Sequence, residues 1–164
     1  MEARRASQQP SYPFQLSLRI RHPSIDPQSI SRELQIEPEH SFRAGEPRES
    51  ASGLAVRPVH AESYWLATID PATLLPGKAL DLGLGPHVLH TIAGGALDSA
   101  LFLWTNSVLR RHADFFHRLQ SEGGEVRLIV ALSARKARGF TVTPHVSKAL
   151  SDLRIPIDFE LAHR

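Results

Sequence analysis

Three segments within residues 24–65 decide how this chain folds: I-D-P-Q-S-I-S-R-E-L-Q-I-E-P at 25–38, F-R-A-G-E-P at 42–47 and S-Y-W at 63–65. Asp26 can accept hydrogen bonds from the free backbone N–H groups at a helix start. Pro27 suits the first helical position, where an N–H would have no partner. Pro38 limits the helix, because the residue before a proline avoids helical backbone angles. The stretch therefore predicts a capped helix, a turn-rich loop and the beginning of a strand.

Alternating or continuous apolar residues predict strands on both sides of this stretch. Alternation places one face of a strand on the core and the other in water, whereas a nearly continuous apolar run indicates a central strand covered on both faces. The segment V-R-L-I-V-A-L within residues 125–133 is of the second kind. We expect strands at residues 14–21, 62–69, 125–133, 140–143 and 155–161.

Apolar residues at helical spacing predict one long helix over residues 98–121, ended by Gly123-Gly124. A shorter helix is expected after Thr143, which can act as its cap, with Pro144 first. Residues 37–61 show no periodicity and are expected to form a long loop. Residues 70–97 are an irregular Leu/Gly/Pro-rich insert.

The predicted order is β-α-β-α-β-β-α-β, which belongs to the α+β class. We expect a mainly antiparallel sheet of four to five strands, with helices on one face and a ferredoxin-like strand order. The domain covers residues 13–164, and residues 1–12 are expected to be a disordered tail. A chain of 164 residues is long enough to bury one substantial core.

The composition excludes several classes of protein. The chain has no cysteine, so disulfide scaffolds and thiolate metal sites are excluded. No apolar run reaches the roughly 18 residues of a membrane span, and the N-terminus lacks the apolar core of a signal peptide. We expect a cytoplasmic protein without membrane contact. The single Asn and single Met beside many Ala, Leu and Arg are typical of a GC-rich bacterial genome.

The segments quoted above, the first strand and the closing L-S-D-L-R-I-P-I-D-F-E-L resemble a bacterial family, the domain-of-unknown-function family 4279. The resemblance covers about three-quarters of the chain, and residues 71–95 depart from it. It implies a fold and no chemistry, since the family has no assigned activity. The genomic company of some members implies a partner-binding role.

The loop around His40, Arg43, Gly45 and Glu46 is the first candidate binding site. Arg43 can receive an anion as a planar fork, and Gly45 lets a backbone approach closely. The structural alternative, which we favour, is that Arg43 pairs with Glu46 or a carbonyl group and holds the loop. Trp65 can form an aromatic wall for a ligand, although a core position is favoured because tryptophan buries a large area.

A second candidate surface lies on the predicted sheet. Arg19 and Arg21 share one strand face, and Asp158 and Glu160 share another, so cross-strand ion pairing is expected if the two strands are neighbours. The basic turn at Arg135, Lys136 and Arg138 has no interleaved aromatic residue, so nucleic-acid binding is not expected there.

No catalytic, metal or cofactor signature is present in the sequence. The chain lacks G-x-S-x-G, a P-loop and a dinucleotide fingerprint. His87 and His90 are three apart without a third ligand, while His112 and His117 would lie about 140° apart on a helix. We therefore expect no catalytic residues, no metal and no cofactor.

The sequence favours a non-enzymatic protein-binding or interaction module that uses the open sheet face or the loop at 38–47. A homodimer would use the same surface. The first alternative is a small-ligand sensor or enzyme, whose pocket would bring Arg43, His40 and a histidine of residues 87–90 together. The second is weak nucleic-acid binding, which needs one patch of Arg19, Arg21, Arg127 and Arg138.

Overall fold

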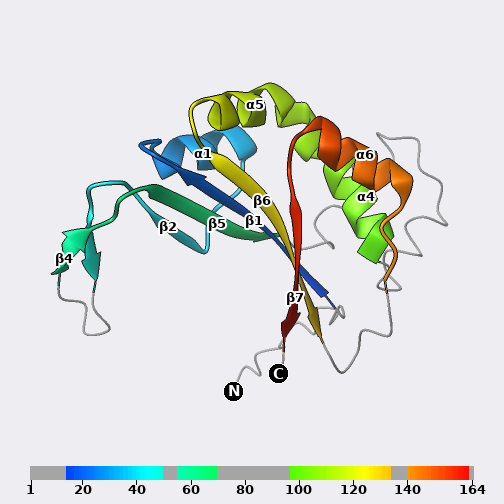
Figure 1. The fold of residues 1–164 in the computed structure, drawn as a ribbon, viewed down its shortest axis with the longest axis horizontal. Coiled ribbons are helices and arrows are strands. Elements are labelled where there is room, and N and C mark those ends of the chain that lie inside the picture. Colours follow the sequence, from blue (N-terminus) through cyan, green and yellow to red (C-terminus); the bar gives the residue numbers. More distant parts are fainter. Residues whose placement is uncertain (1–13, 50–54, 70–96, 134–139, 163–164) are drawn as a thin grey trace, which may run out of the picture.

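A computed structural model describes residues 14–49, 55–69, 97–133 and 140–162 of the chain (Figure 1). The predicted tail at residues 1–12 and almost all of the predicted insert at residues 70–97 lie outside this described part. Those two expectations therefore stay predictions.

A mixed five-stranded sheet forms the centre of the fold, with the strand order β2-β5-β1-β6-β7. Neighbouring strands are antiparallel except β6 and β7, which are parallel. The strands are β1 (Phe14–His22), β2 (His40–Phe42), β5 (Ser63–Ile69), β6 (Glu125–Ser133) and β7 (Ile157–Ala162). A separate two-stranded hairpin consists of β3 (Pro47–Glu49) and β4 (Ala55–Val59).

The helices lie together over one face of the sheet, while the hairpin projects beside β2 and β5 (Figure 1). They are α1 (Pro27–Leu34), α4 (Leu97–Ser107), a 3₁₀ turn (Leu109–His112), α5 (Ala113–Ser121) and α6 (Pro144–Asp152). Since parallel strands need a crossover connection, α6 carries the chain from the end of β6 back to the start of β7.

The core lies between the helices and the sheet. Leu16, Leu18 and Ile20 of β1 are fully buried there, and Trp65 and Trp104 are completely enclosed. Burying such a side chain contributes about 1.5–3 kcal/mol, so this layer supplies most of the stabilisation. The polar residues of β1 point to the other face, which the described helices leave uncovered.

The expected α+β class and the helices on one face are confirmed, but the sheet is mixed rather than purely antiparallel. The ferredoxin-like order is not confirmed. The predicted strand at residues 140–143 is wrong, because these residues form no strand. The backbone N–H of Thr143 instead donates to Asp98 Oδ1 at 2.8 Å, and β6 finds its second neighbour in β7.

The single helix predicted over residues 98–121 is interrupted. The hydroxyl groups of Thr105 and Ser107 donate to the carbonyls of Leu101 and Leu103, four residues earlier. Such bonds compete with the helical ladder and bend helices. After this turn the chain passes through the 3₁₀ turn before α5 begins, so the apolar stripe continues along two helices instead of one.

The caps at the two short helices follow the sequence. Asp26 accepts from the backbone N–H of Gln28 at 3.0 Å, and Pro27 is the first residue of α1. Thr143 occupies the cap position of α6, but its side chain makes no capping bond. No helix in the described ranges is long and apolar enough to cross a membrane.

Candidate functional site

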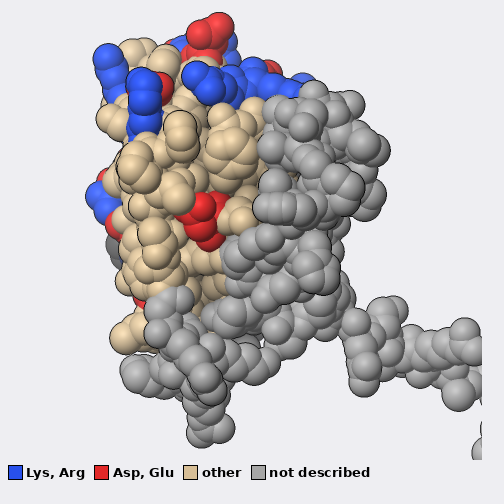
Figure 2. Space-filling model, turned by 90° about the vertical axis from the view of Figure 1, so that its right-hand side faces the viewer, with Lys and Arg blue, Asp and Glu red and all other residues tan. Residues whose placement is uncertain are grey.

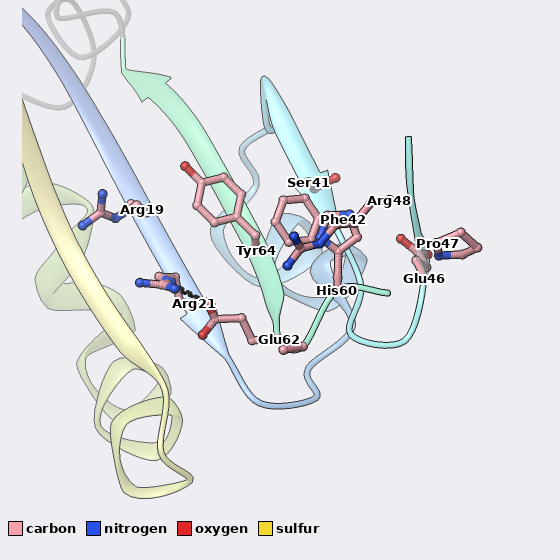
Figure 3. Close-up of a pocket in the computed structure, with 11 residues that line it drawn as sticks. Arg19, Arg21, Ser41, Phe42, Glu46, Pro47, Arg48, His60, Glu62 and Tyr64 are labelled. Atoms are coloured by element: carbon pink, nitrogen blue, oxygen red, sulfur yellow. Dashed lines mark hydrogen bonds and ion pairs between the residues drawn. The ribbon is translucent and has the colours of Figure 1, made fainter. Parts of the chain in front are cut away.

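A groove of about 770 Å³ lies on the uncovered side of the sheet, where the hairpin stands beside it (Figure 3). The sheet contributes Arg19 and Arg21 of β1, Tyr64 of β5 and Phe42 of β2. The groove is partly open to solvent, and it combines aromatic and charged side chains.

The opposite wall comes from the hairpin and the segment that follows it. Arg48 of β3 and His60, just after β4, line the groove together with Glu46 and Glu62. In Figure 3 the Arg48 side chain reaches from the hairpin strand toward Phe42 of the sheet. The groove therefore lies between two elements that belong to different sheets.

Three aromatic rings form the floor of the groove. Phe42 stacks on His60 with ring centroids 3.7 Å apart, and on Tyr64 with centroids 5.1 Å apart. The register explains this row, because Phe42 is paired with Tyr64 and Tyr64 with Arg21 across the sheet. An aromatic pair with the spacing of Phe42 and Tyr64 contributes about 0.5–1.5 kcal/mol beyond burial, so these two rings have a preferred arrangement on the sheet.

A tight turn connects β2 to the hairpin and sets the position of the second wall. Gly45 has a φ of 85°, a left-handed conformation that favours glycine. Its N–H donates to the His60 carbonyl at 2.8 Å, and the His60 N–H donates to the Glu46 carbonyl at 2.9 Å. The Glu46 carboxylate accepts from the Arg43 backbone N–H at 2.8 Å.

Both carboxylates in the groove already have partners. Glu46 holds the turn, and Glu62 accepts from Arg21 Nε at 2.7 Å. The Arg48 side chain is exposed, and no residue of the described part of the chain pairs with it. Arg19 Nε is buried and has no hydrogen-bond partner among the described residues. Among the described residues, Arg48 is therefore the arginine of this groove whose guanidinium is exposed and has no partner.

An ion-pair network lies beside the groove on the same sheet face. Arg127 of β6 contacts Glu125 at 2.6 Å and Asp158 of β7 at 3.2 Å. Arg19 lies directly across from Arg127 and is 3.7 Å from the same Asp158 carboxylate. The carboxylates of Glu125 and Asp158 raise the pKa of the Arg127 guanidinium above its ordinary value. Arg127 is thus permanently charged and neutralised by neighbours.

The expected pairing of Arg19 and Arg21 with Asp158 and Glu160 assumed adjacent strands, and that assumption is wrong. Strand β6 lies between β1 and β7. Arg19 reaches Asp158 across β6, while Arg21 pairs with Glu62 at the end of its own strand pair. Glu160 is exposed and forms no ion pair with any other described residue.

The predicted loop residues are separated by the structure. Glu46 lines the groove, whereas Arg43 is exposed and contributes only its backbone to the turn. His40 lies on the same sheet face, paired with Leu66, but does not line the groove. Trp65 is fully buried and donates from Nε1 to Ser31 Oγ at 3.0 Å. It occupies the core position that the sequence favours and does not face a ligand.

Sequence reasoning missed the aromatic floor and Arg48. One signal was present: residues alternate along a strand, so a core position for Trp65 places Tyr64 on the opposite face. Nothing in the sequence indicated that Phe42 would pair with Tyr64, because a three-residue strand carries too little pattern. His60 and Arg48 reach the site only through the hairpin, whose pairing the sequence does not specify.

The remaining candidates stay apart from the groove. His112 Nδ1 lies 3.2 Å from Glu33, and His117 Nε2 lies 3.1 Å from the Asp152 carbonyl. No group of three metal-ligating side chains occurs among the residues that the structure describes. His87, His90 and the basic turn at 135–138 lie outside those residues.

The side of the molecule away from the hairpin has a smaller candidate binding site. Figure 2 shows Lys and Arg gathered along its upper rim, above a largely uncharged surface. A hollow of about 230 Å³ between α4 and α6 is lined there by Phe102, His145 and Lys148 among others. It is small and lies at the helix surface.

No family model, no curated protein and no solved structure matches the chain. The resemblance to the domain-of-unknown-function family 4279 therefore stays a prediction. The groove itself is the basis for the functional proposal.

Proposed function

We propose that the chain is a non-enzymatic protein-binding module, and that a segment of its partner lies in the groove between the sheet and the hairpin. The observation that carries this proposal is the row of aromatic rings of Phe42, Tyr64 and His60 in a groove of about 770 Å³, which also holds the exposed Arg48 guanidinium without a partner among the described residues. Aromatic side chains and arginine dominate the binding energy at protein interfaces.

The shape of the site supports a peptide-like ligand. The groove is partly open to solvent and lies on the sheet face opposite the core, so an extended segment can enter it without displacing core side chains. The sheet on this face is covered by no described helix. An arginine beside a row of aromatic rings can bind the polar part of a partner side chain while the rings contact its apolar part, which suits a short stretch of a partner chain.

Site-specific photo-crosslinking tests this proposal. A photo-crosslinking amino acid is placed at Ala61, an exposed residue that lines the groove. The matched control carries it at Ser147, an exposed residue of α6 on the helix side. Irradiation in lysate of the source cells is expected to yield one discrete adduct from position 61 and none from position 147.

The identity and the groove dependence of the adduct decide the outcome. Mass spectrometry is expected to find a second protein, and Tyr64→Ala is expected to reduce the adduct at least tenfold. If the adduct instead contains two copies of this chain, the groove is the interface of a homodimer and no second protein is needed. Equal labelling from positions 61 and 147 would contradict the proposal.

A small-ligand sensor or enzyme is the second candidate, favoured by one observation: the groove volume falls in the range of about 300–1,000 Å³ that is usual for small-molecule sites. The residues expected to converge do not support it, since Arg43 and His40 do not line the groove. A metabolite that perturbs the amide signals of Ser41 and Tyr64 while no protein adduct forms would favour this candidate.

Nucleic-acid binding finds less support. Arg21, Arg19 and Arg127 share the sheet face but are paired with carboxylates. A phosphate backbone needs several unpaired cations in a row. The paired arginines leave no such row in the described part of the sheet.

A further inference from the structure

The charges that line the groove are unequal. Three arginines, Arg19, Arg21 and Arg48, face two glutamates. Glu46 accepts from a backbone N–H, and Glu62 accepts from Arg21. Arg19 and Arg21 each contact a carboxylate, Asp158 and Glu62 respectively. Arg48 is the one lining arginine without a partner among the described residues, so its exposed guanidinium is free to bind a negative group.

We infer that the partner segment carries an aspartate or glutamate side chain, whose carboxylate binds the Arg48 guanidinium while the neighbouring part of the segment lies on the aromatic floor. This inference rests on the proposed function and names the chemistry of the partner. An arginine can bind a carboxylate through two parallel N–H···O bonds, and such charged bonds are about twice as strong as neutral ones.

The position of Arg48 supports this role. It belongs to the hairpin wall and its side chain reaches across toward Phe42, so a bound carboxylate would contact both walls (Figure 3). The Arg48 guanidinium forms no ion pair with another described residue, so a carboxylate could bind it without breaking an existing one. Displacing Glu62 from Arg21 is not required, because Arg48 is already unpaired among the described residues.

The same charges disfavour a polyanion. A nucleic-acid strand or a run of phosphates would place further negative charges beside Glu46 and Glu62, both of which line the groove. Like charges at such distances repel each other. The adjoining Arg127 cannot compensate, because Glu125 and Asp158 hold it. A single carboxylate flanked by uncharged residues fits the charge distribution of the groove.

A display selection with random peptides tests the inference. A library of random 12-residue segments is selected on three forms of the full chain: wild type, Arg48→Gln and Arg111→Gln. Arg111 is an exposed arginine of the helix layer with no side-chain partner among the described residues, which makes it a matched control. The sequences of each selected pool are compared with the input library.

The expected result is enrichment of Asp and Glu in the pools selected on wild type and on Arg111→Gln, and loss of that enrichment on Arg48→Gln. For one selected peptide, replacing its acidic residue with the amide is expected to weaken binding at least tenfold in fluorescence anisotropy. The same replacement in the peptide is expected to change binding to the Arg48→Gln variant little. The two changes remove the same contact, so their effects on binding do not add.

Two results would overturn this inference and leave the proposed protein-binding function intact. One is enriched peptides without acidic residues, and the other is an acidic preference that persists on Arg48→Gln. Tighter binding of a labelled dT12 oligonucleotide than of the selected peptides would also overturn it in favour of nucleic acid. If wild type enriches no peptide over the library, the proposed protein-binding function fails, and the inference fails with it.

Discussion

The His22 side chain shows how a single buried polar residue shapes the start of α1. It is 5% exposed, and its Nδ1 accepts from the backbone N–H groups of Ser24 and Ile25 at 3.1 and 3.0 Å. In the neutral ring the proton is then on Nε2, which lies 3.4 Å from the Glu122 carboxylate. The ring thereby fixes the turn between β1 and the helix.

We expect His22→Ala to lower the free energy of unfolding by about 1–3 kcal/mol, because a buried ring is removed and two partly buried N–H groups lose their acceptor. His22→Asn is expected to lose less, since an asparagine side-chain oxygen accepts from the N–H two residues on. Urea unfolding of both variants measures the difference. An equal loss would show that the ring is needed only for its packing.

Neighbouring residues on β5 illustrate what a sequence reveals at this scale. Trp65 is expected in the core and is buried there, and alternation alone then assigns Tyr64 to the open face. The role of Tyr64 was not predictable, because its partner Phe42 comes from a strand with no sequence signal. Alternation along a strand shows which face of the sheet a side chain points to, but it does not show which residues of other strands lie beside it.

At the level of elements, two adjacent glycines at the end of α5 have different tasks. Gly123 has a φ of 87°, the left-handed conformation that often ends a helix. At Gly124, an added Cβ would lie 2.7 Å from the Leu119 carbonyl oxygen and from the His22 ring. The first glycine is required by its backbone angle and the second by close packing.

Gly124→Ala is therefore expected to lower the free energy of unfolding by about 1–3 kcal/mol, the usual range for overpacking. Gly123→Asn is expected to be tolerated with a smaller loss, because asparagine adopts the left-handed conformation more readily than other residues. Thermal unfolding of the two single variants compares them. A larger loss in Gly123→Asn would reverse this assignment.

The boundaries of long elements were less predictable than their existence. Apolar spacing correctly indicated helix on both sides of residues 108–112, but it could not show the interruption there, since the hydroxyl bonds of Thr105 and Ser107 leave the stripe in place. The segment at 140–143 has strand-forming residues and yet pairs with no strand. Tertiary contacts, here the bond from Thr143 to Asp98, override local preference.

At the scale of the whole molecule, the α+β class and the one-sided helix layer follow from patterns that the sequence displays. The order of the strands does not. The parallel pairing of β6 and β7 joins segments separated by α6, and the pairing of β2 with β5 joins segments separated by the hairpin. Such long-range choices depend on packing that no single segment encodes.

The hairpin is expected to open separately from the main sheet. In the described residues, β3 and β4 pair only with each other, and an isolated two-stranded hairpin is marginally stable. We expect the amides of Gly45 and His60, which bond across the base of the hairpin, to exchange with solvent at least tenfold faster than those of Leu18 and Val130 in the central strands.

Native-state hydrogen exchange followed by NMR measures these four amides under identical conditions. Equal protection would mean that the hairpin and the sheet unfold as one unit, and the independence of the hairpin would be contradicted.

The location of the groove between the two sheets has a consequence for binding strength. One wall moves with the core and the other with the hairpin, so only molecules whose hairpin is closed are competent to bind. The apparent dissociation constant then equals the intrinsic value divided by the competent fraction. A change that merely raises this population, with no new contact to the partner, would tighten the complex, and partner binding would in turn slow the exchange of the hairpin amides.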